Sequence, residues 1–121
     1  MANEITLTTS IRWARSGIVL QATQTDSITQ TGTAAISNVQ AIGNTSEAVV
    51  FGEVTDPAYI YFKNLDATSK VYIGVVSPVT SVNAAITLEP GKADRVSTTI
   101  ALWYAISETG TINLEVLAVQ R

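Results

Sequence analysis

The chain has 121 residues, enough for one domain with a single core, and charged residues make up only 14% of it against 46% hydrophobic residues. Soluble domains typically carry about 25% charged residues, so this surface is rich in uncharged Thr, Ser and Gln side chains. The formal net charge of −3 offers no basic field to a phosphate backbone, which argues against nucleic acid as a partner.

Two residue types that carry much enzyme chemistry are missing, because the chain contains neither cysteine nor histidine. Disulfides, thiolate chemistry and the usual nitrogen and sulfur metal ligands are therefore not available. The first ten residues lack the basic and apolar regions of a secretion signal, and no run approaches the roughly 18 to 20 apolar residues that span a bilayer. We expect a protein made in the cytoplasm, with no signal peptide, transmembrane segment or membrane partner.

Short runs of Val, Ile, Thr and Tyr, broken by Gly, Pro, Asn and Asp, predict β-strands along the whole chain. The first predicted strand covers about residues 4–13. Its apolar face holds Ile5, Leu7, Ile11 and Trp13. Residues 18–31 and 33–43 predict two strands of unusual polarity, and we expect this polar strand pair or arm near 18–43 to be a solvated edge or to lie against a neighbouring subunit.

The remaining strands are expected after a turn at Gly43-Asn44, at a spacing of about 8 to 12 residues. Their approximate ranges are 48–54, 58–64, 70–76, 83–88, 95–106 with a possible interruption, and 111–119. Many short strands at such spacing are typical of an antiparallel sandwich or jelly roll. The sequence therefore predicts an all-β fold: one antiparallel, jelly-roll-like β-sandwich over residues 1–121, with about nine strands.

The strand predicted at 58–64 is apolar on both faces. Successive side chains of a strand alternate between faces, so Ile60 and Phe62 point one way while Tyr59 and Tyr61 point the other. A sheet with one solvated face would alternate apolar and polar residues, and this strand does not. We expect Ile60 and Phe62 to face the core and the two tyrosines to face a partner.

Two turns are predicted to shape the sandwich. Glu89-Pro90-Gly91-Lys92 is typical of a type II turn, in which Pro90 presets φ and Gly91 accepts a positive φ. Asn64 and Asp66 are expected to be structural turn residues after the strand at 58–64.

Acid–base chemistry requires titratable groups brought together, and this chain offers only scattered carboxylates. Eight of its ten Asp and Glu residues are candidates: Glu47, Glu53, Asp56, Asp66, Glu89, Asp94, Glu108 and Glu115. The sequence also lacks a calcium-binding loop pattern and a P-loop. We therefore expect no catalytic residues, no metal site and no cofactor, and we expect that the protein is not an enzyme.

The aromatic side chains allow two interpretations. Tyr and Trp are enriched at protein interfaces, so we expect Tyr59, Tyr61, Trp103 and Trp13 to contact another subunit. In Trp103-Tyr104 the two rings must face opposite sides, so one is core and the other outward. The alternative is a platform of exposed aromatic rings on which sugars stack, which would make the chain a glycan-binding module.

Several short segments, taken in order, resemble small virion structural proteins encoded by bacteriophages. They are TGT at 31–33, VQAIG at 39–43, SEA at 46–48, FGEV at 51–54, YFKNLDAT at 61–68, VYIG at 71–74, LEPGK at 88–92, WYA at 103–105 and LEVL at 114–117, after the opening MANEI. These are mostly strand and turn signatures. In such families the LxPGE-like turn usually ends in an acidic residue, where this chain has Lys92.

The resemblance implies a non-enzymatic virion component of a tailed bacteriophage, made in the host cytoplasm and located in the virion. It implies a capsid decoration (cement) protein that stabilises the shell, or alternatively a tail or fibre component. The implied partners are further copies of the chain, as a trimer or higher oligomer, and other virion proteins such as the major capsid or tail proteins.

Overall fold

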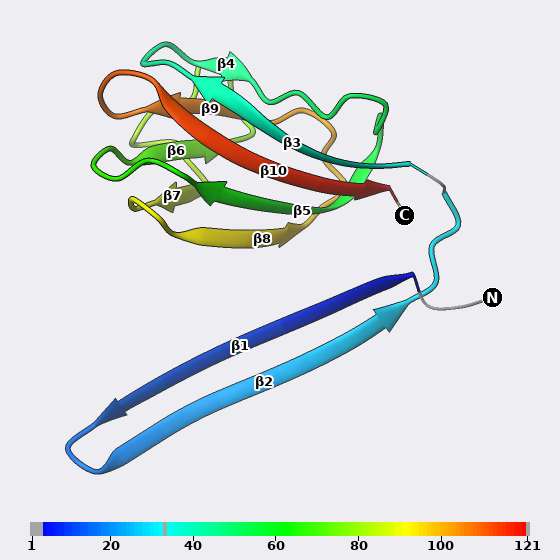
Figure 1. Ribbon diagram of the computed structural model, residues 1–121, viewed down its shortest axis with the longest axis vertical. Coiled ribbons are helices and arrows are strands. Elements are labelled where there is room, and N and C mark those ends of the chain that lie inside the picture. The colour runs from blue at the N-terminus through cyan, green and yellow to red at the C-terminus, as the bar shows by residue number, and fades with distance from the viewer. Residues whose placement is uncertain (1–3, 33, 121) are drawn as a thin grey trace. The chain divides into compact units, whose positions relative to one another are not determined.

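A computed structural model describes residues 4–32 and 34–120, which form ten β-strands and no helix. The chain divides into two compact units, residues 1–32 and residues 33–121 (Figure 1). The first unit is a β-hairpin and the second is a two-sheet structure. The sequence predicted one domain with a polar strand pair or arm near 18–43, whereas the division between the two units falls after Gly32, inside that range.

The hairpin unit pairs β1 (Ile5–Arg15) with β2 (Ile18–Ile28), antiparallel and in unbroken register. Ser16 and Gly17 form the loop between them, with φ angles of 51° and 79°. Positive φ at both loop residues is the signature of a type I′ turn, whose twist matches that of the flanking strands. This loop therefore holds the eleven residues of each strand in register.

The strand pairing predicted for the polar arm is wrong. β2 pairs with β1, while β3 (Ala35–Ile42) pairs with β10 (Ile112–Gln120) in the second unit. The two-residue loop at Ser16-Gly17, with positive φ at both residues, joins the strands on either side of it into a hairpin. Thr33, the first residue of the strand predicted at 33–43, lies outside the described residues.

The second unit consists of two antiparallel sheets of four strands. One sheet has the order β3-β10-β5-β8 and the other β4-β9-β6-β7. The remaining strands are β4 (Glu47–Ala48), β5 (Pro57–Asn64), β6 (Val71–Gly74), β7 (Ile86–Leu88), β8 (Ala93–Ser97) and β9 (Tyr104–Ser107). Figure 1 shows the two sheets as the layers of a sandwich, which confirms the predicted all-β, antiparallel fold class.

The eight sandwich strands pair as nested hairpins. β6 pairs with β7, β5 with β8, β4 with β9 and β3 with β10. Two further pairings, β10 with β5 and β9 with β6, complete the two sheets. The chain therefore runs as one long strand pair that folds over on itself to enclose a core.

The core lies between the sheets and takes side chains from both. Ile60 and Phe62 come from one sheet, while Val71 and Ile73 come from the other, and all four are fully buried. This confirms that Ile60 and Phe62 face the core. The segment predicted as a strand at 48–54 is a strand only at its start, since Val49, Phe51 and Val54 enter the core from a loop.

The turn at Gly91 has the predicted geometry. Gly91 has a φ of 75°, and the Lys92 amide donates a hydrogen bond of 3.1 Å to the Glu89 carbonyl. A Cβ added at Gly91 would meet no atom within 4 Å, so only backbone strain opposes a substitution.

We expect Gly91→Val to lower the free energy of unfolding by about 1–2 kcal/mol, because β-branched residues are strained at positive φ. Gly91→Asn is the matched control and should cost less, since Asn tolerates this region. Urea unfolding followed by circular dichroism measures both changes. Equal stability of Gly91→Val and the unchanged chain would contradict the strain.

Candidate functional site

Trp103 and Tyr59 do not meet the expectation of partner-facing aromatic rings. Trp103 is 4% exposed, its ring centroid lies 6.0 Å from that of Phe62, and its indole N–H donates to the Ile100 carbonyl at 3.0 Å. The prediction is wrong for Trp103 because its ring fills the space between the sheets, which leaves Tyr104 as the outward ring. Tyr59 is 9% exposed, so the chain itself already covers it and little of its ring remains for a partner.

Tyr61 and Trp13 keep exposed ring surface, but they belong to different units. Tyr61 is half-buried on the outer face of its sheet, where its cross-strand neighbours are Leu117 and Arg95. Trp13 is 47% exposed in the hairpin unit. The four predicted aromatic residues therefore do not form one platform within either unit.

The predicted turn residues Asn64 and Asp66 organise one end of the sandwich through hydrogen bonds. The buried Asn64 side chain donates to the carbonyls of Ser69 (2.8 Å) and Leu88 (3.2 Å) and accepts from the Asp66 amide (2.9 Å). The Asp66 carboxylate accepts from the amides of Ser69 (2.7 Å) and Thr68 (3.0 Å). These backbone donors, that of Ser69 first, hold the pKa of Asp66 below its usual value. Both residues are structural.

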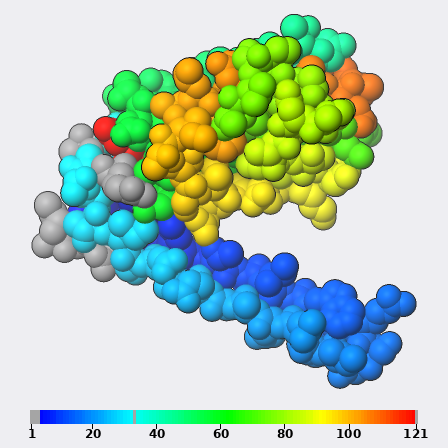
Figure 2. Space-filling model, turned by 180° about the vertical axis from the view of Figure 1, so that it is seen from behind, coloured from blue at the N-terminus to red at the C-terminus, as the bar shows by residue number. Residues whose placement is uncertain are grey.

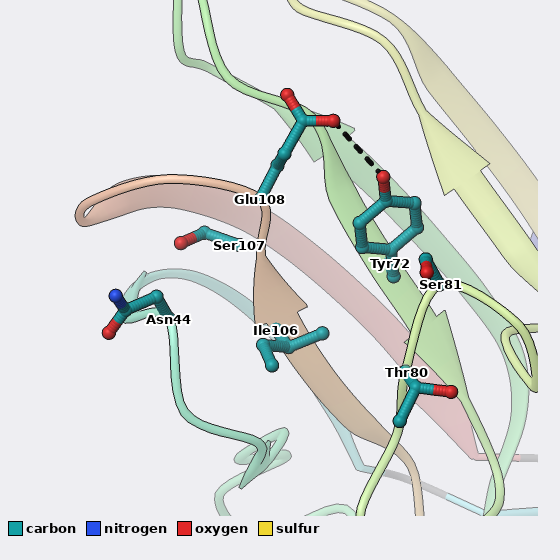
Figure 3. Close-up of a pocket in the computed structure, with 7 residues that line it drawn as sticks. All are labelled: Asn44, Tyr72, Thr80, Ser81, Ile106, Ser107 and Glu108. Carbon is teal, nitrogen blue, oxygen red and sulfur yellow. Dashed lines mark hydrogen bonds between the residues drawn. The ribbon is translucent and has the colours of Figure 1, made fainter.

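A shallow pocket of about 370 Å³ lies on the outer side of β6 and β9 (Figure 3). Six of the seven residues that line it have a polar group in the side chain; the seven are Asn44, Tyr72, Thr80, Ser81, Ile106, Ser107 and Glu108. Tyr72 and Ile106 are cross-strand neighbours, so their side chains share the outer face of the sheet. The sequence did not single out this group, because Asn44, Thr80 and Ser81 come from loops distant along the chain.

The electrostatics of the pocket favour a neutral tyrosine that donates a hydrogen bond. The Tyr72 hydroxyl donates to Glu108 Oε2 at 3.1 Å, drawn as a dashed line in Figure 3. Desolvation raises the pKa of Tyr72, and the hydrogen bond to Glu108 raises it further. The pocket thus presents a protonated phenol, one carboxylate and several hydroxyl and amide groups, which suits recognition of a polar, hydroxylated ligand.

The hairpin unit exposes several large apolar side chains. Figure 2 shows it, in blue to light blue, as a long and narrow strip of side chains. Ile11 is 73% exposed and Leu20 is 62% exposed, and Trp13, Ile18 and Val19 are each about half exposed. Four of them, Ile11, Trp13, Ile18 and Leu20, share one face of the hairpin, and soluble monomers rarely display a large contiguous apolar surface without a binding role. The alternation of Ile11 and Trp13 was visible in the sequence, but their exposure was not.

Three further observations bear on function. Within residues 4–32 and 34–120, no group of three or more His, Cys, Asp or Glu side chains could hold a metal ion. None of the described segments is a helix long and apolar enough to cross a membrane. No protein-family model, curated protein or solved structure matches the chain.

Proposed function

We propose that the chain is a non-enzymatic structural protein of a tailed-bacteriophage virion, a capsid decoration (cement) protein that stabilises the shell through contacts between subunits. In this proposal the sandwich unit is the body of the subunit, and the exposed hairpin is the element that contacts other proteins. The partners are further copies of the chain, as a trimer or higher oligomer, and the major capsid protein. The sequence segments that resemble phage virion proteins are the reason for choosing this class of protein.

The nested strand pairing supports the proposal. Pairing of the first sandwich strand with the last, and so on inward to β6 and β7, is the arrangement expected of an eight-stranded jelly roll. Viral capsid domains and lectin domains are frequent users of this architecture. The fold is therefore compatible with a shell protein, although fold alone does not define function.

The observation that carries the proposal is the exposure of the hairpin. An isolated two-stranded hairpin is marginally stable in water, yet every residue from Thr8 to Ser27 is exposed in the single chain. A ribbon with exposed Ile, Leu and Trp side chains gains stability when a partner covers them. Assembly on a particle would provide that cover.

Cryo-electron microscopy of the purified virion that encodes the chain tests the proposal. We expect the protein on the outer shell in hundreds of copies. A handful of copies at the tail would favour the alternative of a tail or fibre component. Absence of the chain from purified particles, together with a monomeric chain at micromolar concentration that does not bind capsids, would contradict a structural role in the virion.

A second candidate function is glycan binding, and the pocket at Tyr72 is the observation that favours it. Its hydroxyl, amide and carboxylate groups match the hydroxyl groups of a sugar, and Tyr72 adds an aromatic ring. Saccharide titration of the full chain, followed by NMR, would test it. Chemical shift changes confined to the pocket and lost in Tyr72→Ala would support a glycan-binding module, while no change at millimolar sugar would reject it.

A further inference from the structure

The two faces of the hairpin differ sharply in polarity. Cross-strand partners in an antiparallel pair point to the same face, so the register assigns every side chain to one side. One face, here called the apolar face, carries Ile11, Trp13, Ile18, Leu20 and Ala22 near the turn. The other face carries Thr6, Thr8, Ser10, Arg12, Gln21, Thr23, Thr25 and Ser27, with Ala14 and Val19 next to the turn. Within the described residues of the hairpin unit, no second sheet covers the apolar face.

The apolar face carries two charged side chains within the strands, and they have opposite signs. Arg15 lies beside the turn, and Asp26 lies towards the other end, opposite Leu7. They are eight residues apart along the ladder, which is about 27 Å at about 3.4 Å per residue. The Asp26 carboxylate accepts a hydrogen bond of 2.9 Å from Gln24, on the same face. The rung formed by Ile11 and Ala22 lies midway between the two charged rungs.

This charge distribution is complementary to itself. If two such faces meet antiparallel about a two-fold axis at the Ile11–Ala22 rung, Arg15 of each copy lies at the Leu7–Asp26 rung of the other, where its long side chain can reach Asp26 diagonally. A membrane or a nucleic acid would instead favour a face of net positive charge. The small Ala22 side chain also leaves shallow hollows on both sides of that rung, one beside Trp13 and Leu20 and the other beside Thr9 and Gln24. The large Trp13 ring of the other copy can enter the second hollow.

We propose that the apolar face of this hairpin is covered by the same face of the hairpin of a second copy of this chain, antiparallel about a two-fold axis at the Ile11–Ala22 rung. The inference rests on the proposed function, which includes association between copies of the chain. It specifies the surface through which two copies associate. This hairpin contact joins two copies of the chain, either within one oligomer or between two neighbouring oligomers. Arg15 and Asp26 set the direction of the pair, and Trp13 and Leu20 supply most of its apolar contact.

The size of the face sets the expected strength. A strand of eleven residues is about 37 Å long and a two-stranded ribbon is about 10 Å wide, so the face spans roughly 370 Å². Specific, stable complexes bury about 800 Å² on each partner. The hairpin contact is therefore weak by itself in solution, and it is strengthened where copies are held close together on a particle. We expect a concentration-dependent dimer in the micromolar range.

Two matched substitutions in the full-length chain test the contact by sedimentation equilibrium. Leu20→Glu places a carboxylate on the apolar face, and Gln21→Glu places the same group on the opposite face at the next position. We expect Leu20→Glu to raise the dissociation constant at least about tenfold, because the carboxylate would be buried without a partner. Gln21→Glu should leave it unchanged. A thermal melt of each variant confirms that the sandwich unit remains folded.

Cross-linking provides a second readout that does not depend on stability. The chain contains no cysteine, so Ala22→Cys and Thr23→Cys each introduce a single thiol, on the apolar face near the axis and on the opposite face. A short bismaleimide should join two Ala22→Cys chains and leave Thr23→Cys chains single. A wild-type chain that remains monomeric at high concentration, equal effects of the two Glu variants, or no cross-link in Ala22→Cys would each overturn the inference.

The outcome is separable from that of the proposed function. If the chain decorates virions but Leu20→Glu associates like the unchanged protein, the hairpin contact is refuted and the virion role stands. If the hairpin dimer forms but the chain is absent from particles, the virion role is refuted and the contact stands.

Discussion

Phe62→Ser is expected to unfold the sandwich unit under conditions in which Tyr61→Ser leaves it folded. Phe62 has no exposed surface, and its ring lies against Trp103, with centroids 6.0 Å apart. Truncation of a buried Phe costs about 3–5 kcal/mol through lost burial and the cavity that remains. A buried hydroxyl without a partner adds about 1–3 kcal/mol. The sum is comparable with the whole stability of a typical domain, about 5–15 kcal/mol.

Tyr61 is the matched control because it is the adjacent residue of the same strand on the outer face. Its ring is half-buried beside Leu117 and Arg95, so Tyr61→Ser removes surface contacts and opens no cavity in the core. We expect a loss below about 1 kcal/mol and weaker association of the chain. Circular dichroism melts and light scattering separate the two effects. If Tyr61→Ser unfolds the unit and Phe62→Ser only weakens association, the assignment of the two faces is inverted.

The sequence allowed prediction of those features that depend on local alternation and turn chemistry. Two-residue periodicity assigned Ile60 and Phe62 to the core, and Pro90-Gly91 identified a turn that the φ of 75° at Gly91 confirms. Both features depend on residues within a few positions of one another. For the same reason, the all-β class followed from the density of short strands and breaks.

Features that depend on distant pairing were not predictable in the same way. The strand at 18–28 has the same local pattern whichever strand it pairs with, and only the geometry of the Ser16-Gly17 loop selects β1. Trp103 precedes its strand, so strand alternation does not describe its direction, and its ring enters the core from a loop. The pocket at Tyr72 likewise joins two strands and three loops.

The partner surface shows where sequence and structure have to be combined. Low charge and two-faced apolar strands predicted association, and they directed attention to Tyr59 and Trp103, which the chain covers itself. Exposed apolar residues lie in both units, and those of the hairpin include Ile11 and Trp13, whose shared apolar face in the first strand was correctly assigned from the sequence. A regular alternation identifies an apolar face, but only the fold shows whether the same chain covers it.

Asn64→Leu is expected to destabilise the sandwich unit by about 2–4 kcal/mol, because it removes three hydrogen bonds at a position with no exposed surface. The Asn64 amide connects the end of β5 to the Ser69 carbonyl and to Leu88 of β7, which belongs to the opposite sheet. Its carbonyl oxygen also holds the Asp66 amide. Each hydrogen bond contributes about 0.5–1.5 kcal/mol net, and a buried group left without a partner costs about 1–3 kcal/mol.

Asn113→Leu is the control, since Asn113 lies in β10 at an exposed position and the exchange of side chains is the same. Its effect should stay within about 0.5 kcal/mol. For a unit of this size, a loss of about 2–4 kcal/mol lowers the melting temperature by roughly 10 °C or more. Such a drop in Asn64→Leu alone would establish that the buried amide joins the two sheets at this end. Equal melting temperatures of the two variants would show instead that water or main-chain groups replace its hydrogen bonds.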